Sequence, residues 1–159
     1  MKHLPLNLPG SIYASAMPFS SRDLSQTLFD DYGYHDIQTV VLLASEAETV
    51  YHTGRNLRQF YLQKRLKVIY LPVEDFSTPD QTALNQAVDA AFAEAQAGRN
   101  IAIHCYYGRG RTGTFGACLA RKALGMNGVD ALNWIRSHIE GAVENDAQEA
   151  VVMRFGAAG

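Results

Sequence analysis

The sequence is short of cysteine, of excess charge of either sign and of long apolar runs. Its two cysteines, Cys105 and Cys118, are too few for a disulfide scaffold. Its 14 Lys and Arg residues nearly balance its 16 Asp and Glu, so no global basic field attracts nucleic acid or lipid. No apolar run approaches the roughly 18 residues of a membrane span. We therefore expect a cytoplasmic protein with no nucleic-acid partner and no membrane insertion, which can hold an anion only at a local site.

What the sequence does contain is an alternation of strand-like and helix-like segments. The run from 37 to 43 holds four successive apolar residues, which is typical of a strand buried on both faces of a parallel sheet. Two helix starts are indicated by capping patterns, one at Ser20 with Asp23, and one at Thr78 with Pro79 in the first turn. Strands are expected over 12–14, 37–43, 67–73 and 100–104, and helices over 20–32, 56–65, 78–97, 112–124, 129–139 and 146–155.

This order predicts an α/β fold. We expect one domain over residues 1–159, with a central, mostly parallel β-sheet flanked by helices on both sides. A further short helix is expected after Ser45, which forms a capping box with Glu48. A stretch of basic residues near the middle of the chain is interpreted as a solvated helix face rather than as a binding surface; it comprises Arg55, Arg58, Lys64, Arg65 and Lys67.

An anion-binding loop is predicted where the last expected strand meets the helix after it. The segment reads His-Cys-Tyr-Tyr-Gly-Arg-Gly-Arg-Thr-Gly over residues 104–113. Five residues between Cys105 and Arg111 let successive backbone N–H groups turn inward around one tetrahedral oxyanion, and the helix N-terminus adds partial positive charge. A phosphate or sulfate ion is therefore expected to fit the loop. The predicted binding residues are Tyr106, Tyr107, Gly108, Arg109, Gly110 and Arg111.

The residue types in this loop indicate nucleophilic chemistry at phosphorus. A helix N-terminus and a nearby arginine favour the thiolate form of Cys105. The planar fork of Arg111 can bind two phosphoryl oxygens and follow the spread of charge in a loose transition state. Thr112 is placed to donate its hydroxyl to the sulfur when the cysteine leaves. His104 is expected to order the loop from behind rather than to touch substrate.

A nucleotide-binding interpretation competes with this one. Gly108, Gly110 and Gly113 have the spacing of the dinucleotide fingerprint, which requires a second strand after the helix, ending in an acidic residue. Asp130 has the required distance but lies in an expected helix. That interpretation also leaves Cys105 and Arg111 without a role, so we favour the phosphate chemistry.

The same segment resembles the His-Cys-x5-Arg-Thr/Ser-Gly signature of the protein tyrosine phosphatase superfamily, and the short chain resembles its dual-specificity branch. The resemblance implies a phosphocysteine intermediate, with Cys105 as nucleophile, Arg111 as phosphate ligand and Thr112 as leaving-group assistant. It implies phosphorylated proteins as substrates, carrying phosphotyrosine and also phosphoserine or phosphothreonine, or another phosphomonoester. Alternatives are a phosphoinositide, an inositol phosphate, an RNA 5′-phosphate, or a module that binds phosphate without catalysis. Neither a metal nor a cofactor is implied.

The general acid that this chemistry needs is expected on the loop after the strand at 67–73. Asp75 is the preferred residue because its loop should emerge at the same sheet edge as Cys105, and Glu74 is the alternative. Gln148 resembles the glutamine that holds the hydrolytic water in the family, although an exposed helix glutamine is nearly as well supported. Cys118 is expected to be a buried core residue rather than a redox partner of Cys105.

Overall fold

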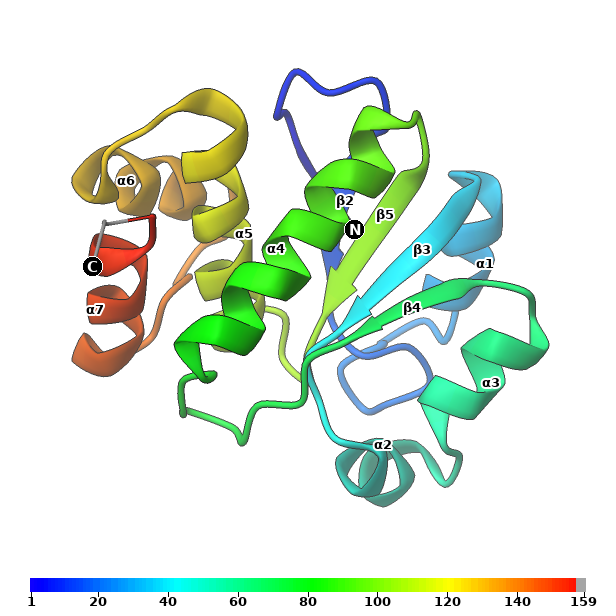
Figure 1. The fold of residues 1–159 in the computed structure, drawn as a ribbon. Helices are drawn as coiled ribbons and strands as arrows, with labels where there is room; N and C mark the ends of the chain where they lie inside the picture. Colours follow the sequence, from blue (N-terminus) through cyan, green and yellow to red (C-terminus); the bar gives the residue numbers. More distant parts are fainter. Residues whose placement is uncertain (157–159) are drawn as a thin grey trace.

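A sheet of five strands runs through residues 1–156, the part of the chain that this computed structural model describes (Figure 1). The strands lie in the order β1-β2-β5-β3-β4, and only the pairing of β1 with β2 is antiparallel. The strands are β1 Lys2–Leu4, β2 Ile12–Ser15, β3 Ile37–Leu42, β4 Lys67–Tyr70 and β5 Asn100–His104.

Helices cover both faces of this sheet (Figure 1). On one face lie α1 Leu28–Tyr34 and α3 Leu57–Gln63, and α2 Glu46–Thr53 packs against α3. The other face carries α4 Gln81–Gln96, α5 Gly110–Leu124, α6 Gly128–His138 and α7 Asp146–Arg154. The expected α/β architecture is therefore confirmed. None of the described helices has the length and hydropathy needed to cross a bilayer.

The apolar run of β3 is explained by burial on both sides of the sheet. Val40 and Leu42 face the core formed with α1 and α3, whereas Val41 and Leu43 face the core formed with α4 to α7. All four side chains are at most 1% exposed. Burial of each of these side chains stabilises the fold by about 1.5–3 kcal/mol. A strand with polar residues at alternate positions would lose this contribution on one face of the sheet.

Parallel pairing brings the ends of four strands to one edge of the sheet. Because β2, β3, β4 and β5 run in the same direction, the loops after them meet at that edge. Hydrogen bonds extend this arrangement beyond the strands, since the amides of Leu71 and Val73 donate to the carbonyls of Leu42 and Leu43. The segment containing Cys105 follows β5 at this edge, where open α/β sheets bind their ligands.

The expected helix from Ser20 with Asp23 is wrong. Residues 18–27 form turns instead, and α1 begins only at Leu28. The reason is that the Asp23 carboxylate is used within the turns, where it accepts hydrogen bonds from the backbone amides of Phe19, Thr27 and Leu28. Ser20 donates its hydroxyl to the carbonyl of Met17 rather than capping a helix.

Two further boundaries and one additional strand also differ from expectation. The N-cap of α4 is Asp80 rather than Thr78, because the Asp80 carboxylate accepts from the amide of Ala83 at 3.0 Å. The strand expected over 67–73 ends as β4 at Tyr70, where the chain leaves regular pairing before Pro72. Strand β1 was not expected, since its three residues carry no recognisable alternation.

At the opposite edge of the sheet, the buried carboxylate of Glu94 joins three elements. It accepts hydrogen bonds from Thr39 at 3.2 Å and Lys67 at 2.6 Å, and it also pairs with Arg99. Burial acts to raise the pKa of Glu94, but these three partners outweigh it and hold the pKa below the ordinary value of 4.5. The charged form therefore stabilises the fold.

We expect Glu94→Gln to lower the free energy of unfolding by about 1–2 kcal/mol at pH 7, because charge-assisted hydrogen bonds are lost. A depressed pKa contributes stability above the unfolded-state pKa, and that contribution is lost as the pH falls through the folded-state pKa. The difference between wild type and variant in urea unfolding should therefore shrink below about pH 4.5.

Asp89→Asn provides the matched control. Asp89 forms an ion pair with Lys122 at 2.8 Å, but its side chain is 64% exposed. Its removal should cost at most about 1 kcal/mol at any pH. Equal losses for Glu94→Gln at pH 7 and pH 3 would contradict the assignment of a charged, stabilising Glu94.

Candidate active site

The loop that follows β5 curves tightly around the end of the strand and enters α5 at Gly110. Gly108 adopts φ +84°, a conformation that residues with a side chain rarely take. A Cβ atom at Gly108 would also lie 2.7 Å from the carbonyl oxygen of Ser15. Glycine is therefore required here both for its backbone conformation and for the contact between the loop and the end of β2.

The sulfur of Cys105 lies inside this loop and accepts two hydrogen bonds. The backbone amide of Gly108 donates at 3.3 Å, and the hydroxyl of Thr112 donates at 3.1 Å. Cys105 is only 2% exposed and sits before the first turn of α5. Two hydrogen-bond donors and the N-terminus of α5 therefore lie at the sulfur.

His104 lies behind the loop and is completely buried. Its Nδ1 is 2.8 Å from the carbonyl oxygen of Cys105, and its Nε2 is 2.7 Å from the hydroxyl of Tyr61. Because a carbonyl only accepts, Nδ1 must carry the hydrogen and Tyr61 must donate to Nε2. Burial lowers the pKa of His104 to about 4, so the ring is neutral. The neutral ring thus fixes the backbone of the nucleophile from the core side.

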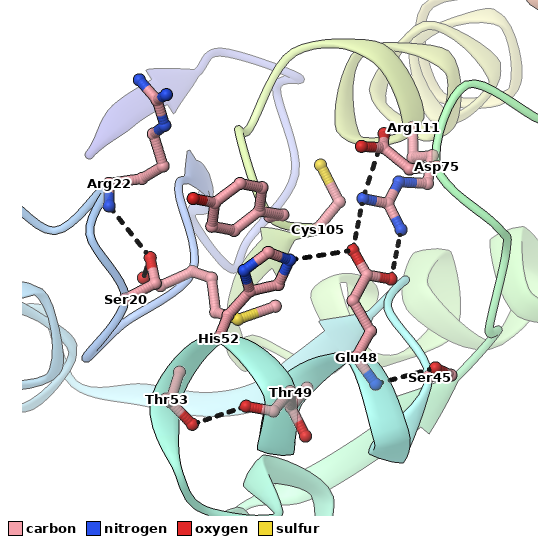
Figure 2. Close-up of polar contacts among 12 residues, drawn as sticks. Ser20, Arg22, Ser45, Glu48, Thr49, His52, Thr53, Asp75, Cys105 and Arg111 are labelled. Atoms are coloured by element: carbon pink, nitrogen blue, oxygen red, sulfur yellow. Dashed lines mark hydrogen bonds and ion pairs between the residues drawn. The ribbon is translucent and has the colours of Figure 1, made fainter.

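Arg111 is held by a residue whose contact with it was not expected from the sequence. Its Nη1 and Nη2 atoms each donate to one oxygen of Glu48 at 2.8 Å, and Nη1 also donates to the carbonyl of Val73. Figure 2 shows Glu48 between Arg111 and His52. Burial opposes the charge of Arg111, but Glu48, Cys105 and Asp75 together raise its pKa above the ordinary value. The guanidinium therefore stays charged and fixed.

The sequence assigned Glu48 only a local role. As expected, Ser45 caps α2 by accepting a hydrogen bond from the Glu48 amide at 3.1 Å. The Glu48 carboxylate, however, turns away from the cap and binds Arg111. An acidic residue just after a strand that shares an edge with β5 was the available signal, because parallel strands bring such residues together.

The remaining donors of Arg111 define an open edge. Of the five N–H groups of a guanidinium, those of Nη1 and one of Nη2 are used by Glu48 and Val73. Asp75 lies 3.2 Å from Nη2, and Nε is buried without a hydrogen-bond partner among the described residues. A buried donor without a partner is costly unless a ligand satisfies it. The Nε–Nη2 edge therefore points to an oxyanion as its missing partner.

Asp75 lies on the loop after β4, and this loop reaches the same edge of the sheet (Figure 2). One of its oxygens approaches Arg111 and also accepts from the amide of Phe76, and the side chain is half exposed. The neighbouring Glu74 is exposed, and its carboxylate makes no hydrogen bond or ion pair within the described part of the chain. Of the two candidate acids, the structure brings Asp75 to Arg111.

Gln148 is buried beside the start of α5 rather than exposed. Its Oε1 accepts from the amide of Glu144 at 2.8 Å, and its Nε2 donates to the carbonyl of Ser77 at 3.3 Å. A Cβ atom at Gly110 would lie 3.1 Å from Oε1 of Gln148 and even closer to Glu144. Gln148 thus links α7 to the loop of Asp75, and its function in holding a water molecule stays a prediction.

The two tyrosines of the loop face different neighbours. Tyr106 stacks on His52, with ring centroids 3.6 Å apart, and its hydroxyl shares a hydrogen bond with Ser21. Tyr107 is 39% exposed, and the guanidinium groups of Arg22 and Arg109 both lie against its ring. Arg22 was missed because it lies far from the loop in the sequence, within the segment wrongly expected to be a helix.

Cys118 lies in the core and is fully buried. Burial raises the pKa of its thiol to about 12, so the thiol stays protonated and unreactive. The dinucleotide alternative is also excluded, because in residues 1–156 no strand follows α5. The element that follows α5 is the helix α6, and Asp130 lies in that helix.

Residues 8–152 match a family model described as Swiss Army Knife protein, DSP-PTPase phosphatase domain, abbreviated PTP-SAK. Among curated relatives, an uncharacterized protein of Methanocaldococcus jannaschii is 33% identical over 93 residues, which are 57% of this chain and 60% of that protein. The human dual specificity protein phosphatase CDC14C is 34% identical over 80 residues, which are 50% of this chain and 17% of that protein. The matches therefore span less than two thirds of these relatives.

Solved structures resemble nearly the whole chain. Kinase associated phosphatase (KAP), with serine in place of its catalytic site cysteine, has a TM-score of 0.83 at 20% identity and covers 97% of this chain and 92% of its own. Tk-PTP in the active form has a TM-score of 0.76 at 25% identity, with 97% and 95% covered. PTPMT1 in complex with PI(5)P has a TM-score of 0.76 at 17% identity, with 98% and 94% covered. These likenesses establish the fold.

The contact between Glu48 and Arg111 generates a first prediction about this site. Glu48→Gln places an amide NH2 against a buried guanidinium and should lower the free energy of unfolding by about 2–3 kcal/mol in urea titrations. Glu46→Gln is the control, because Glu46 lies in the same first turn of α2 and only accepts from Asn56. It should cost less than about 1 kcal/mol. Equal losses in the two variants would show that Glu48 acts only through its helix.

Proposed function

This chain belongs to the PTP-SAK family and is a dual-specificity phosphatase-like member of the protein tyrosine phosphatase superfamily, and from that membership we propose that it is an active phosphomonoester hydrolase. We propose a phosphocysteine intermediate, with phosphorylated proteins as the substrates. The observation that carries the proposal is the open Nε–Nη2 edge of Arg111 in the same loop as the hydrogen-bonded sulfur of Cys105.

Binding of the phosphoryl group comes first in the proposed mechanism. The Nε and Nη2 atoms of Arg111 bind two of its oxygens, and the amides of the loop from Tyr106 to Gly110 turn toward it. Asp75 must leave Nη2 for this to happen, since it lies 3.2 Å from that atom. Substrate binding thereby releases the carboxyl group that the next step needs. Glu48 stays bound to the other edge and keeps the guanidinium in position.

The chemical step then transfers the phosphoryl group to sulfur. An electron pair of the Cys105 thiolate forms the S–P bond while the bond from phosphorus to the leaving oxygen breaks, and protonated Asp75 gives its proton to that oxygen. Water next attacks the phosphocysteine, and the Asp75 carboxylate takes a proton from it. Thr112 donates its hydrogen bond to the departing sulfur. Inorganic phosphate and the Cys105 thiolate are the products.

Protein substrates are proposed over the alternatives for two reasons. The loop contains no lysine, and Arg109 is its one cation besides Arg111, whereas a phosphoinositide or inositol phosphate carries several anionic groups. Tyr107, which is 39% exposed, places an aromatic side chain beside the loop, where a peptide can contact it. A non-catalytic module would not need a hydrogen bond from Thr112 to the sulfur. The neighbour PTPMT1 binds PI(5)P, so phosphoinositides, inositol phosphates and RNA 5′-phosphates belong in the substrate panel beside phosphopeptides.

Cys105→Ser should abolish turnover of p-nitrophenyl phosphate, because a serine hydroxyl is not ionised at neutral pH and the S–P bond cannot form. Cys118→Ala should keep the activity, since Cys118 lies in the core with its thiol protonated. Both are measured as kcat/KM at pH 6–7. Full activity of the serine variant would overturn the mechanism, whereas a wild type inactive on every phosphomonoester but able to bind phosphopeptides would favour the non-catalytic module.

Asp75→Asn should lower kcat by about 10²–10³-fold, because the leaving oxygen loses its proton donor. The same change should strengthen inhibition by inorganic phosphate, since Nη2 of Arg111 no longer pairs with a competing carboxylate. Glu74→Gln is the matched control on the neighbouring residue and should change kcat by less than about threefold. A larger loss in Glu74→Gln than in Asp75→Asn would assign the acid to Glu74.

A further inference from the structure

The turns of residues 18–27 are fixed against the phosphate-binding loop. The amide of Met17 donates to the carbonyl of Tyr106 at 3.0 Å, and the hydroxyls of Ser21 and Tyr106 lie 2.7 Å apart. Asp23, which is 2% exposed, holds the turns together through its three backbone hydrogen bonds. Arg22, between the anchored Ser21 and Asp23, is therefore positioned by the fold beside the loop.

Arg22 and Arg109 converge on one aromatic ring. The guanidinium carbon of Arg22 lies 3.9 Å from the ring centroid of Tyr107, and that of Arg109 lies 4.6 Å from it. Figure 2 draws Arg22 and Arg111 on opposite sides of Cys105 in that view, so Arg22 is separate from the Nε–Nη2 edge of Arg111. Each guanidinium is attracted to the face of the Tyr107 ring, but the ring does not reduce the electrostatic repulsion between the two cations.

Among the described residues, no carboxylate neutralises this pair of arginines. Within residues 1–156, neither guanidinium has a carboxylate within 4.0 Å or a hydrogen bond to another group. Arg111 and Arg136, by contrast, both bind carboxylates. Two unpaired cations on a ring that belongs to the catalytic loop leave N–H donors available to an anionic group of the substrate.

A cavity of about 520 Å³ runs along this pair. It is lined by Arg22, Tyr107, Gly108 and Arg109, and by Leu24, whose side chain is 92% exposed. Three carboxylates also line it, Asp23, Asp31 and Glu140, of which Asp23 is satisfied by backbone amides. The cavity is thus a groove lined by an exposed leucine, by a tyrosine ring with two guanidinium groups next to the phosphate-binding loop, and by carboxylates.

We propose that Arg22 and Arg109 form a second anion-recognition point, which selects phosphopeptides that carry an acidic residue next to the phosphorylated one. This inference rests on the proposed function and names its preferred substrate class. A peptide fits the groove better than a polyphosphorylated small molecule does, because the groove combines Arg22 and Arg109 with Leu24 and Tyr107, and Lys2 also lines it. An extended peptide presents alternating side chains of this kind at a spacing of about 6–7 Å on each face.

The test compares two phosphotyrosine peptides that differ only in their flanking residues, Asp and Glu in one and Asn and Gln in the other. For the wild type, kcat/KM should favour the acidic peptide by about fivefold or more at low salt. In Arg22→Gln, Arg109→Gln and the double variant, this ratio should fall progressively toward about one. Raising the salt from about 0.05 to 0.5 M should shrink the ratio only where the arginines remain.

Arg58→Gln is the matched control. Arg58 also stacks on a tyrosine, with its guanidinium carbon 4.1 Å from the ring centroid of Tyr70, and no carboxylate of residues 1–156 lies within 4.0 Å of it. It lies on α3, however, and does not line the cavity. In this variant, the ratio of kcat/KM for the acidic peptide to kcat/KM for the neutral peptide should equal that of the wild type. A wild-type ratio near one, or an unchanged ratio in the double variant, would overturn the subsite while leaving the hydrolase intact.

Two further outcomes separate this inference from the proposed function. A higher kcat/KM for a soluble inositol bisphosphate than for either peptide, lost in Arg22→Gln, would overturn the peptide assignment and assign the cations to a second phosphate. No turnover of any substrate by the wild type would instead sink the proposed function itself. In that case the binding of the same two peptides to the wild type, followed by fluorescence anisotropy, still decides whether Arg22 and Arg109 prefer the acidic one.

Discussion

The buried pairing of Arg111 with Glu48 is the contact on which the arrangement of the site depends. Arg111 belongs to the segment after β5, Glu48 to the helix after β3, and Val73, which also binds the guanidinium, to the loop after β4. One charged group therefore ties three loops at the carboxyl edge of the sheet. Removing a guanidinium from water costs roughly several kcal/mol, and the two parallel hydrogen bonds to the Glu48 carboxylate offset this cost.

In the proposed mechanism, one guanidinium both binds the phosphoryl group and releases the proton donor. In the structure this guanidinium faces Glu48, Asp75 and the sulfur of Cys105. A phosphate dianion that takes the Nε–Nη2 edge adds negative charge and displaces Asp75 from Arg111. In the proposed mechanism, the substrate itself thus frees the carboxyl group that its leaving group requires.

The sequence was informative where chemistry is carried by neighbouring residues. The loop from His104 to Thr112 contains its own strand end, its glycines and its helix start, so the hydrogen bonds to the sulfur follow from spacing. Contacts between residues far apart in the sequence could not be predicted in this way. Glu48 fits a local capping pattern, and nothing in that pattern indicates its ion pair with Arg111. Asp23 suggested a helix but serves backbone amides of a turn, and Asp80 took the cap expected of Thr78.

Clusters of charge in the sequence also differ from clusters in space. In the basic stretch near the middle of the chain, Arg55 stacks on Phe19, Arg58 on Tyr70, and Lys67 pairs with Glu94 at the edge opposite the site. Of these three cations, only Lys67 pairs with a carboxylate among the described residues, and none of the three lines the cavity beside Tyr107. Arg22 has no basic neighbour in the sequence, but the turns held by Asp23 carry it to the loop. Which cations the fold places beside the loop therefore follows only from tertiary contacts.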